Sequence, residues 1–202
     1  MKRPLIFSLM VMLAITFTAP VSFAESEWTG NINALVGKRM LENSKWEPLD
    51  DQWGGGLEFD FKQKSWPVSI LFSVSGSSKD EDICCVSDGI FLYSVNNKVE
   101  TLEMSAGLKK YFALGGNAFP YVAVGGSYIE VETSSEAGSF VSGSLLSRGN
   151  DSTTGGFVNG GVMWKMEMFN VGFDIRKLFG TSLKNGFDVD YYQYSLLLGF
   201  GW

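Results

Sequence analysis

Apolar and polar residues alternate over several long stretches of the chain. This period of two constrains the fold more than any other feature, because it is the period of a β-strand. The clearest case is DYYQYSLLLGFGW at 190–202, where every second residue counted back from Trp202 is large and apolar or aromatic. Seven earlier stretches show the same alternation: 28–38, 53–62, 68–76, 101–112, 121–132, 156–165 and 169–177. The sequence therefore predicts eight strands, each with one apolar and one polar face.

The stretch at 121–132 differs from the others because both of its faces are apolar, which leaves its phase open. Glu130 and Glu132 indicate which face is the polar one. The predicted outward set of this strand is then Tyr121, Ala123, Ile129 and Val131.

Strand length, strand number and connection length together predict a closed barrel. Strands of about ten residues suit a tilted crossing of a bilayer, and eight is the smallest common strand number of a membrane barrel. The connections after the second, fourth and sixth strands are short, whereas the other connections are long and polar: 41–52, 77–99, 133–155 and 180–189. We expect an all-β fold, an eight-stranded antiparallel transmembrane β-barrel with up-and-down topology.

The first 24 residues have the parts of a signal peptide: Lys2 and Arg3, an apolar run, and Ser22 and Ala24 at the small positions. The run is short for a membrane anchor, and acidic residues follow it instead of a positive stop-transfer cluster. We expect cleavage after Ala24, which leaves 25–202 as the barrel domain. Loss of the two cations takes the 16 basic side chains to 14 against 22 acidic ones, a net charge of −8, and this charge disfavours nucleic acid as a partner.

The faces opposite the apolar stripe carry seven charged residues: Arg39, Glu58, Asp60, Glu103, Lys109, Asp174 and Arg176. In a membrane barrel these residues would form an ion-pair network in the lumen, because eight strands enclose a space that side chains can fill. A filled lumen argues against a diffusion pore, although a narrow gated channel stays an alternative. In a soluble ligand-binding barrel the same charges would face water instead.

Aromatic residues near the predicted strand ends favour the membrane barrel over the soluble one. Amphipathic rings gather at the two interfaces of a bilayer and form girdles around membrane barrels. The predicted girdle residues are Trp28, Trp53, Tyr121, Trp164, Phe169, Tyr192 and Trp202.

The terminal stripe of Tyr194, Leu196, Leu198, Phe200 and Trp202 resembles the C-terminal signature of bacterial outer-membrane barrel proteins. In those proteins the barrel assembly machinery recognises the last strand, and Phe is the most usual last residue. The mature chain as a whole resembles the small eight-stranded families: the OmpA-like transmembrane domain, OmpX-like proteins and opacity-type proteins. The resemblance implies an outer-membrane protein of a Gram-negative bacterium, with outer-membrane lipids and the assembly machinery as partners. We expect a monomer without cofactor or metal.

Some outer-membrane barrels are enzymes, and the residue types present bear on that alternative. Lipid A deacylases, lipid A palmitoyltransferases and the larger omptin-like proteases all use a histidine, and this chain contains none. A Ser-Lys pair or a carboxylate pair stays open. We expect a non-enzymatic role in envelope integrity or in surface interaction through the loops, with a narrow channel or a lipid A-modifying enzyme as alternatives.

Cys84 and Cys85 are adjacent residues in the second long connection. In an oxidising compartment their thiols would oxidise, either with each other, through a strained eight-membered ring, or with another chain. A metal or redox role is disfavoured because the chain has no histidine and no further cysteine. The prediction at this position is a loop disulfide.

Overall fold

The computed structural model describes residues 27–87, 92–139, 144–184, 186 and 188–202, and the predicted signal peptide lies outside these residues. The described residues form eight strands and the 3-10 helix η1 (Ser44–Trp46). The strands are β1 (Trp28–Leu41), β2 (Asp51–Gln63), β3 (Ser69–Ser87), β4 (Leu92–Tyr111), β5 (Ala118–Ser139), β6 (Ser144–Met166), β7 (Phe169–Phe179) and β8 (Tyr191–Gly201). Among the described residues, no helix is long and apolar enough to span a membrane.

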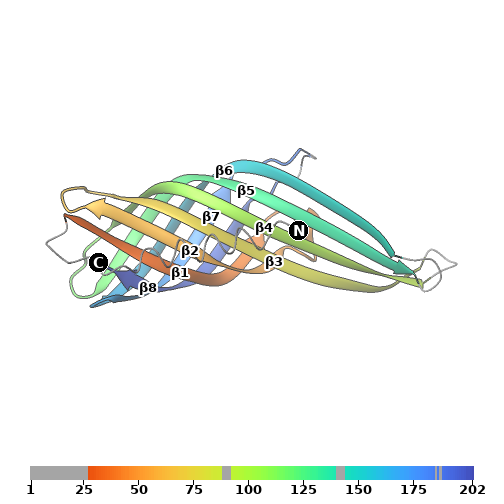
Figure 1. Cartoon of the computed structure of the whole chain (residues 1–202), viewed down its shortest axis with the longest axis horizontal. Coiled ribbons are helices and arrows are strands. Elements are labelled where there is room, and N and C mark those ends of the chain that lie inside the picture. Colours follow the sequence, from red (N-terminus) through yellow and green to blue (C-terminus); the bar gives the residue numbers. More distant parts are fainter. Residues whose placement is uncertain (1–26, 88–91, 140–143, 185, 187) are drawn as a thin grey trace.

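The strands pair in chain order and form a closed antiparallel barrel (Figure 1). The last strand closes the sheet on the first, with a register that runs from Asn31↔Gly201 to Leu41↔Tyr191. Next to the Asn31↔Gly201 end of this ladder, Gly30 and Trp202 exchange two backbone hydrogen bonds of 3.2 and 3.0 Å. The fold class predicted from the sequence is confirmed, and closure pairs the edges that an open sheet would expose.

Close approach of β1 and β8 depends on glycine on both strands of the seam, at Gly37 and at Gly199. A Cβ atom built at Gly37 would lie 2.1 Å from the carbonyl oxygen of Tyr194, a contact that backbone atoms cannot relieve locally. Gly126 on the outer wall shows the contrast, since a Cβ there would meet nothing closer than 3.9 Å. These positions of the seam therefore require glycine for steric reasons, whereas Gly126 on the outer wall has room for a side chain.

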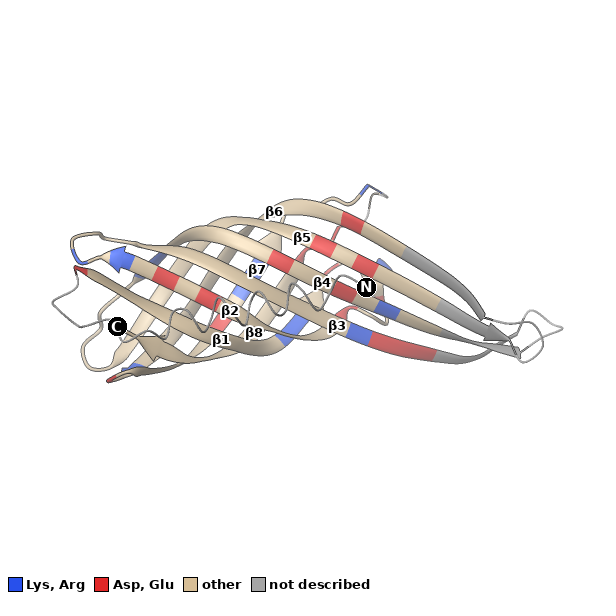
Figure 2. Ribbon diagram, in the orientation of Figure 1, with Lys and Arg blue, Asp and Glu red and all other residues tan. Residues whose placement is uncertain are grey.

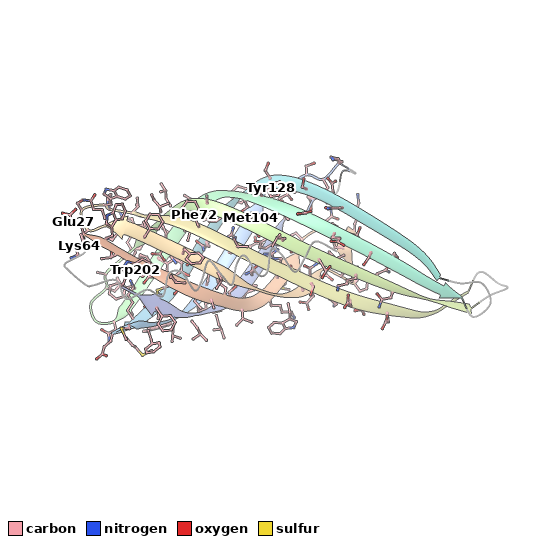
Figure 3. The ribbon with its side chains drawn as sticks, in the orientation of Figure 1. Glu27, Lys64, Phe72, Met104, Tyr128 and Trp202 are labelled. Atoms are coloured by element: carbon pink, nitrogen blue, oxygen red, sulfur yellow. The ribbon has the colours of Figure 1, made fainter. Side chains whose placement is uncertain are left out.

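The barrel wall is apolar on its outside and largely polar on its inside. Three consecutive leucines of β8 show the alternation: Leu196 and Leu198 are 57% and 58% exposed, while Leu197 is completely buried. The exposed apolar side chains include Val36, Leu57, Phe72, Met104, Leu108, Val124, Val158 and Phe173, and Figure 3 shows Phe72, Met104 and Tyr128 along one side of the wall. An outward apolar belt of this kind requires lipid as its solvent, which contradicts the soluble barrel.

The predicted phase of the fifth strand is wrong. Tyr121, Ala123, Ile129 and Val131 are buried inside the barrel, and Val122, Val124 and Tyr128 are on the outer wall. Glu130 and Glu132, which indicated the opposite phase, do face outward, but they lie in the part of β5 that extends beyond the apolar belt. A charge on the outer face is allowed at that level because water replaces lipid there.

The two ends of the barrel differ in their connections. Short turns at 64–68, 112–117 and 167–168 mark one end, called here the turn end, as predicted. The opposite end, called the loop end, has the longer loops 42–50 and 180–190, which also agree with the prediction.

The other two predicted long connections are not loops. Most of 77–99 and 133–155 belongs to β3–β6, which have 19 to 23 residues each against 11 to 14 in the other strands. These four strands extend beyond the rest of the barrel as a four-stranded sheet (Figure 1). We call this the protruding sheet: 79–87, 92–99, 132–139 and 144–155. The polar composition of these segments predicts loops, and the prediction is wrong because strands that extend outside the bilayer lack the apolar stripe.

Candidate functional site

The seven charged residues predicted for the lumen all lie inside the barrel, and none is more than 7% exposed. They form two groups along the barrel axis. The loop-side group contains Arg39, Glu103 and Arg176, and the turn-side group contains Glu58, Asp60, Lys109 and Asp174.

Glu103 on β4 is the centre of the loop-side group. Its carboxylate accepts hydrogen bonds from Nη2 of Arg39 at 3.1 Å and from Nη2 of Arg176 at 2.6 Å. It also accepts from the hydroxyls of Tyr191 and Ser105. One buried acid is therefore neutralised by two arginines from strands on different sides of the lumen, an arrangement that ties β1, β4 and β7 together.

The two arginines have further partners that hold their guanidinium groups in place. Arg39 donates to Oε1 of Gln193 at 3.0 Å and to Oγ1 of Thr101 at 2.9 Å, and it lies 4.0 Å from the ring centre of Tyr191. Arg176 lies 3.9 Å from the ring centre of Phe157. Planar cations between carboxylates and rings suit a desolvated site.

Lys109 on β4 is the centre of the turn-side group. Its Nζ lies 2.6 Å from Oε1 of Glu58, 3.6 Å from Oδ2 of Asp60 and 3.9 Å from the ring centre of Tyr121. Asp60 also accepts from Oη of Tyr111 at 2.7 Å and from Nδ2 of Asn31 at 2.8 Å. The carboxylates of this group thus have both cationic and neutral donors.

Asp174 joins this group through neutral donors. It accepts from Oη of Tyr121 at 2.8 Å and from Nδ2 of Asn159 at 3.1 Å. Sequence reasoning missed the tyrosines 111, 121 and 191 as members of the network and placed Tyr121 on the outer wall. The alternation of β8 could have revealed Tyr191, because Tyr191 directly precedes the outward-facing Tyr192 and must therefore face the lumen.

A cluster of apolar side chains lies at the loop end of the lumen, above the arginines. Its buried members include Val99, Ile129, Val131, Leu178, Leu183 and Val189, with Trp46 and Leu49 packed against them. Loops 42–50 and 180–190 both contribute, and Nε1 of Trp46 donates to the carbonyl of Asp188 at 2.8 Å. The Asp190 carboxylate accepts from the backbone of Gly180 and Thr181. This apolar cap is thus held by both loops.

Two cavities between described residues bear on the function of the lumen. The one between the two charged groups has a volume of only about 10 Å³ and is lined by Glu58, Asn159, Asp174 and Arg176, among others. The other is at the turn end, has a volume of about 200 Å³, and is lined by residues of seven strands and the β6–β7 turn. The part of the chain that the structure describes contains no group of three acidic, cysteine or histidine residues suited to a metal ion.

The described charged side chains of the protruding sheet and its base are mostly acidic (Figure 2). The described acids there are Asp80, Glu81, Asp82, Glu100, Glu130, Glu132 and Asp151, and the described cations are Lys79 and Lys98. Some are paired locally: Lys98 lies 3.2 Å from Glu100, and Asn150 donates to Glu130 at 2.8 Å. Backbone N–H groups of Lys184 and Ser152 donate to Asp151 and lower the pKa of that carboxyl.

Cys84 and Cys85 belong to strand β3, at the point where its pairing with β4 shifts register between Ile83 and Val86. Their position in a loop is therefore wrong. Their side chains are outside the described part of the structure, so the disulfide stays a prediction.

Six of the seven aromatic residues predicted for the girdles are exposed on the outer wall: Trp28, Trp53, Trp164, Phe169, Tyr192 and Trp202. Several form ring contacts near the turn end, such as Trp28 with Trp66 at 5.4 Å and Phe169 with Phe200 at 5.1 Å. Tyr121 is the exception, since its ring is inside the lumen.

No protein-family model matches the sequence, and no curated protein sequence matches it. Solved structures do match. A major outer membrane protein from Thermus thermophilus is 9% identical with a TM-score of 0.56, over 87% of this chain and 99% of that one. Ail of Yersinia pestis is 12% identical with a TM-score of 0.52, over 87% and 97% of the two chains. OprG of Pseudomonas aeruginosa is 13% identical with a TM-score of 0.50, over 87% and 95%. The fold is that of the small outer-membrane β-barrels.

The ion pairs of Glu103 with Arg39 and Arg176 predict how a substitution of Glu103 affects stability. Replacement of Glu103 by Gln should lower the free energy of unfolding by about 3 kcal/mol or more, because two buried arginines lose their counter-charge. The matched control is Asp51→Asn, which breaks an exposed pair with Lys38 and should cost less than about 1 kcal/mol. Urea unfolding in lipid vesicles, followed by tryptophan fluorescence, measures both. Equal stability of the Glu103 variant and the wild type would contradict the assigned role.

Proposed function

We propose that the protein is an integral outer-membrane barrel of a Gram-negative bacterium that acts without catalysis. Its barrel serves as a scaffold for the protruding sheet, which is the interaction surface. The observation that carries this proposal is the contrast between the two parts. The lumen is occupied by paired charges and an apolar cap, whereas the sheet extends away from the barrel, and acids described on it, such as Asp80 and Asp82, are exposed.

Support for a non-conducting lumen comes from three successive barriers along the axis. The apolar cap closes the loop end. The loop-side group, centred on Glu103, lies across the lumen next to the cap, and the turn-side group, centred on Lys109, lies across the lumen nearer the turn end. The cavity between the two charged groups is about 10 Å³, roughly the space of one water molecule and too small for a hydrated ion. An open pore would need all three barriers to rearrange.

Support for an interaction role comes from the charge of the protruding sheet. Ail, which shares the fold, has the printed name attachment invasion locus protein and has been solved with the heparin analogue sucrose octasulfate. In this chain the described charged side chains of the sheet and its base are mainly acidic, so repulsion disfavours a sulfated ligand. The preferred partner is a surface or polymer with exposed positive charges.

The residue types available support a role without catalysis. The chain has no histidine, and the buried carboxylates are engaged by arginine, lysine, tyrosine or asparagine donors. Glu58 and Asp60, the carboxylate pair left open by the sequence, both lie near Lys109 inside the barrel. Neither carboxylate is placed to act on a lipid outside the wall.

Single-channel recording tests the closed lumen. Refolded wild-type protein in a planar bilayer should show no current steps, because paired buried charges and an apolar cap block the ion path. A gel that compares mobility with and without boiling verifies that the barrel has formed. Reproducible steps from a folded sample would contradict the closed lumen and favour the narrow channel.

Binding of charged polymers tests the interaction surface. Protein in lipid nanodiscs should bind polylysine with an affinity that falls as salt rises, and should not bind sucrose octasulfate. The double variant Asp80→Asn, Asp82→Asn should weaken polylysine binding by roughly threefold or more, since two exposed charges are lost. The control Glu27→Gln removes an exposed acid at the turn end and should have no effect. Binding of sucrose octasulfate, or an equal effect of the control, would overturn the proposed surface.

A further inference from the structure

The turn-end cavity has the features of a ligand site. Its volume is about 200 Å³, and it opens at the end of the lumen where the short turns lie. Five inward-facing side chains that line it come from five different strands: Lys62, Ser69, Tyr111, Lys165 and Asn170. Figure 3 shows Trp202 at this end of the barrel.

Two lysines that line this cavity differ from the other cations of the lumen. Arg39, Lys109 and Arg176 each lie within hydrogen-bonding distance of a carboxylate. Among the described residues, by contrast, Lys62 and Lys165 form no ion pair. The Nζ of Lys62 has only a long contact of 3.5 Å to the carbonyl of Trp66, and that of Lys165 lies 4.9 Å from the ring centre of Tyr111.

The nearby acids do not neutralise these lysines. Asp60 lies at the inner wall of the cavity, but its carboxylate is already shared among Asn31, Tyr111 and Lys109. Glu167 lies in the exposed β6–β7 turn at the rim, where water screens its charge. Lys165 is half-buried, so its ammonium has lost part of its hydration without gaining a counter-charge.

The remaining lining residues supply complementary contacts. Tyr111 presents aromatic surface, while Ser69 and Asn170 present a hydroxyl and an amide, and the Asn170 amide also donates to Oδ1 of Asn31 at 3.0 Å. A site with two cations, neutral donors and an aromatic wall is complementary to an anion that has an apolar part.

We propose that the turn-end cavity binds a small organic anion, with its carboxylate or phosphate on Lys62 and Lys165 and its apolar part against the ring of Tyr111. This site goes beyond the proposed surface role, since it lies at the opposite end of the barrel. If the short turns face the periplasm, as in other outer-membrane barrels, the ligand is a periplasmic solute or the end of a periplasmic polymer.

Titration of the refolded protein with two probes, benzoate and phenyl phosphate, tests the site. Benzoate should bind saturably to one site with a dissociation constant on the order of 1 mM, and should shift the NMR signals of the Trp202 indole and the Gly201 amide. Phenyl phosphate distinguishes a phosphate from a carboxylate ligand, and saturable binding of either probe supports the proposal. Benzyl alcohol, the neutral analogue of benzoate, should leave both signals unchanged.

Variants separate the cavity lysines from other lysines at the same end. Lys165→Gln and Lys62→Gln should each weaken binding by about tenfold, because each removes a charge-assisted hydrogen bond. Lys110→Gln is the matched control, since Lys110 is exposed near the same end but does not line the cavity, and it should bind like the wild type. Mobility on a gel with and without boiling shows that each variant has folded, and the second cavity variant covers a failure of the first.

Three results would overturn the site. The first is the absence of saturable binding by either probe up to concentrations about tenfold above the expected dissociation constant. The second is unchanged affinity in both cavity variants. The third is an equal loss of affinity in the Lys110 control, which would indicate a general effect of positive charge at this end. Because the titration is done in isolation from any surface partner, its outcome is independent of the polylysine experiment.

Discussion

Hydrogen bonding between β1 and β8 closes the sheet, and the other features of the structure depend on this closure. A closed ladder pairs the backbone groups of the wall, so the outside can be apolar and face lipid without unpaired donors. The same closure turns the opposite face of every strand inward, into a space just wide enough for side chains. The alternation along each strand therefore separates a lipid-facing wall from a polar interior, and Leu196, Leu197 and Leu198 show the switch from one residue to the next.

A polar interior shielded from water must satisfy its own charges, and this requirement explains the arrangement in the lumen. Glu103 is shared by two arginines and Lys109 by two carboxylates, so that each group connects strands that do not neighbour one another. Buried ion pairs are weak evidence for high stability, because desolvation offsets much of the attraction. Their clearer effect is on register, since a shift of one residue would move Glu103 from the lumen to the lipid face. Among the described cations that line the lumen, those without a carboxylate partner lie at the turn end, beside the larger cavity.

Most of the wall could be predicted from sequence because alternation is a local property. Seven of the eight strand phases, the short turns, six of the girdle aromatics and the inward position of the seven charged residues follow from it. The predicted phase of the fifth strand is wrong because both of its faces are apolar within the lipid-facing belt. Glu130 and Glu132, on which the predicted phase depends, lie beyond that belt toward the protruding sheet. The sequence predicts two loops in place of the protruding sheet, because strands outside the bilayer have no apolar stripe that would distinguish them from loops. Partners such as Tyr191 for Glu103 could not be predicted, since contacts across the lumen depend on the stagger of strands far apart in sequence.

The contacts between the barrel wall and lipid test this account most directly. In lipid nanodiscs with methyl-labelled leucine, nuclear Overhauser effects between acyl chains and protein methyl groups report which leucines touch lipid. We predict strong acyl-chain signals for Leu196 and Leu198 and none for Leu197 between them, or for the buried Leu71 and Leu178. Acyl-chain contacts at Leu197, or their absence at both of its neighbours, would contradict the assignment of the inner and outer faces on which the lumen, the cavity and the proposed functions all depend.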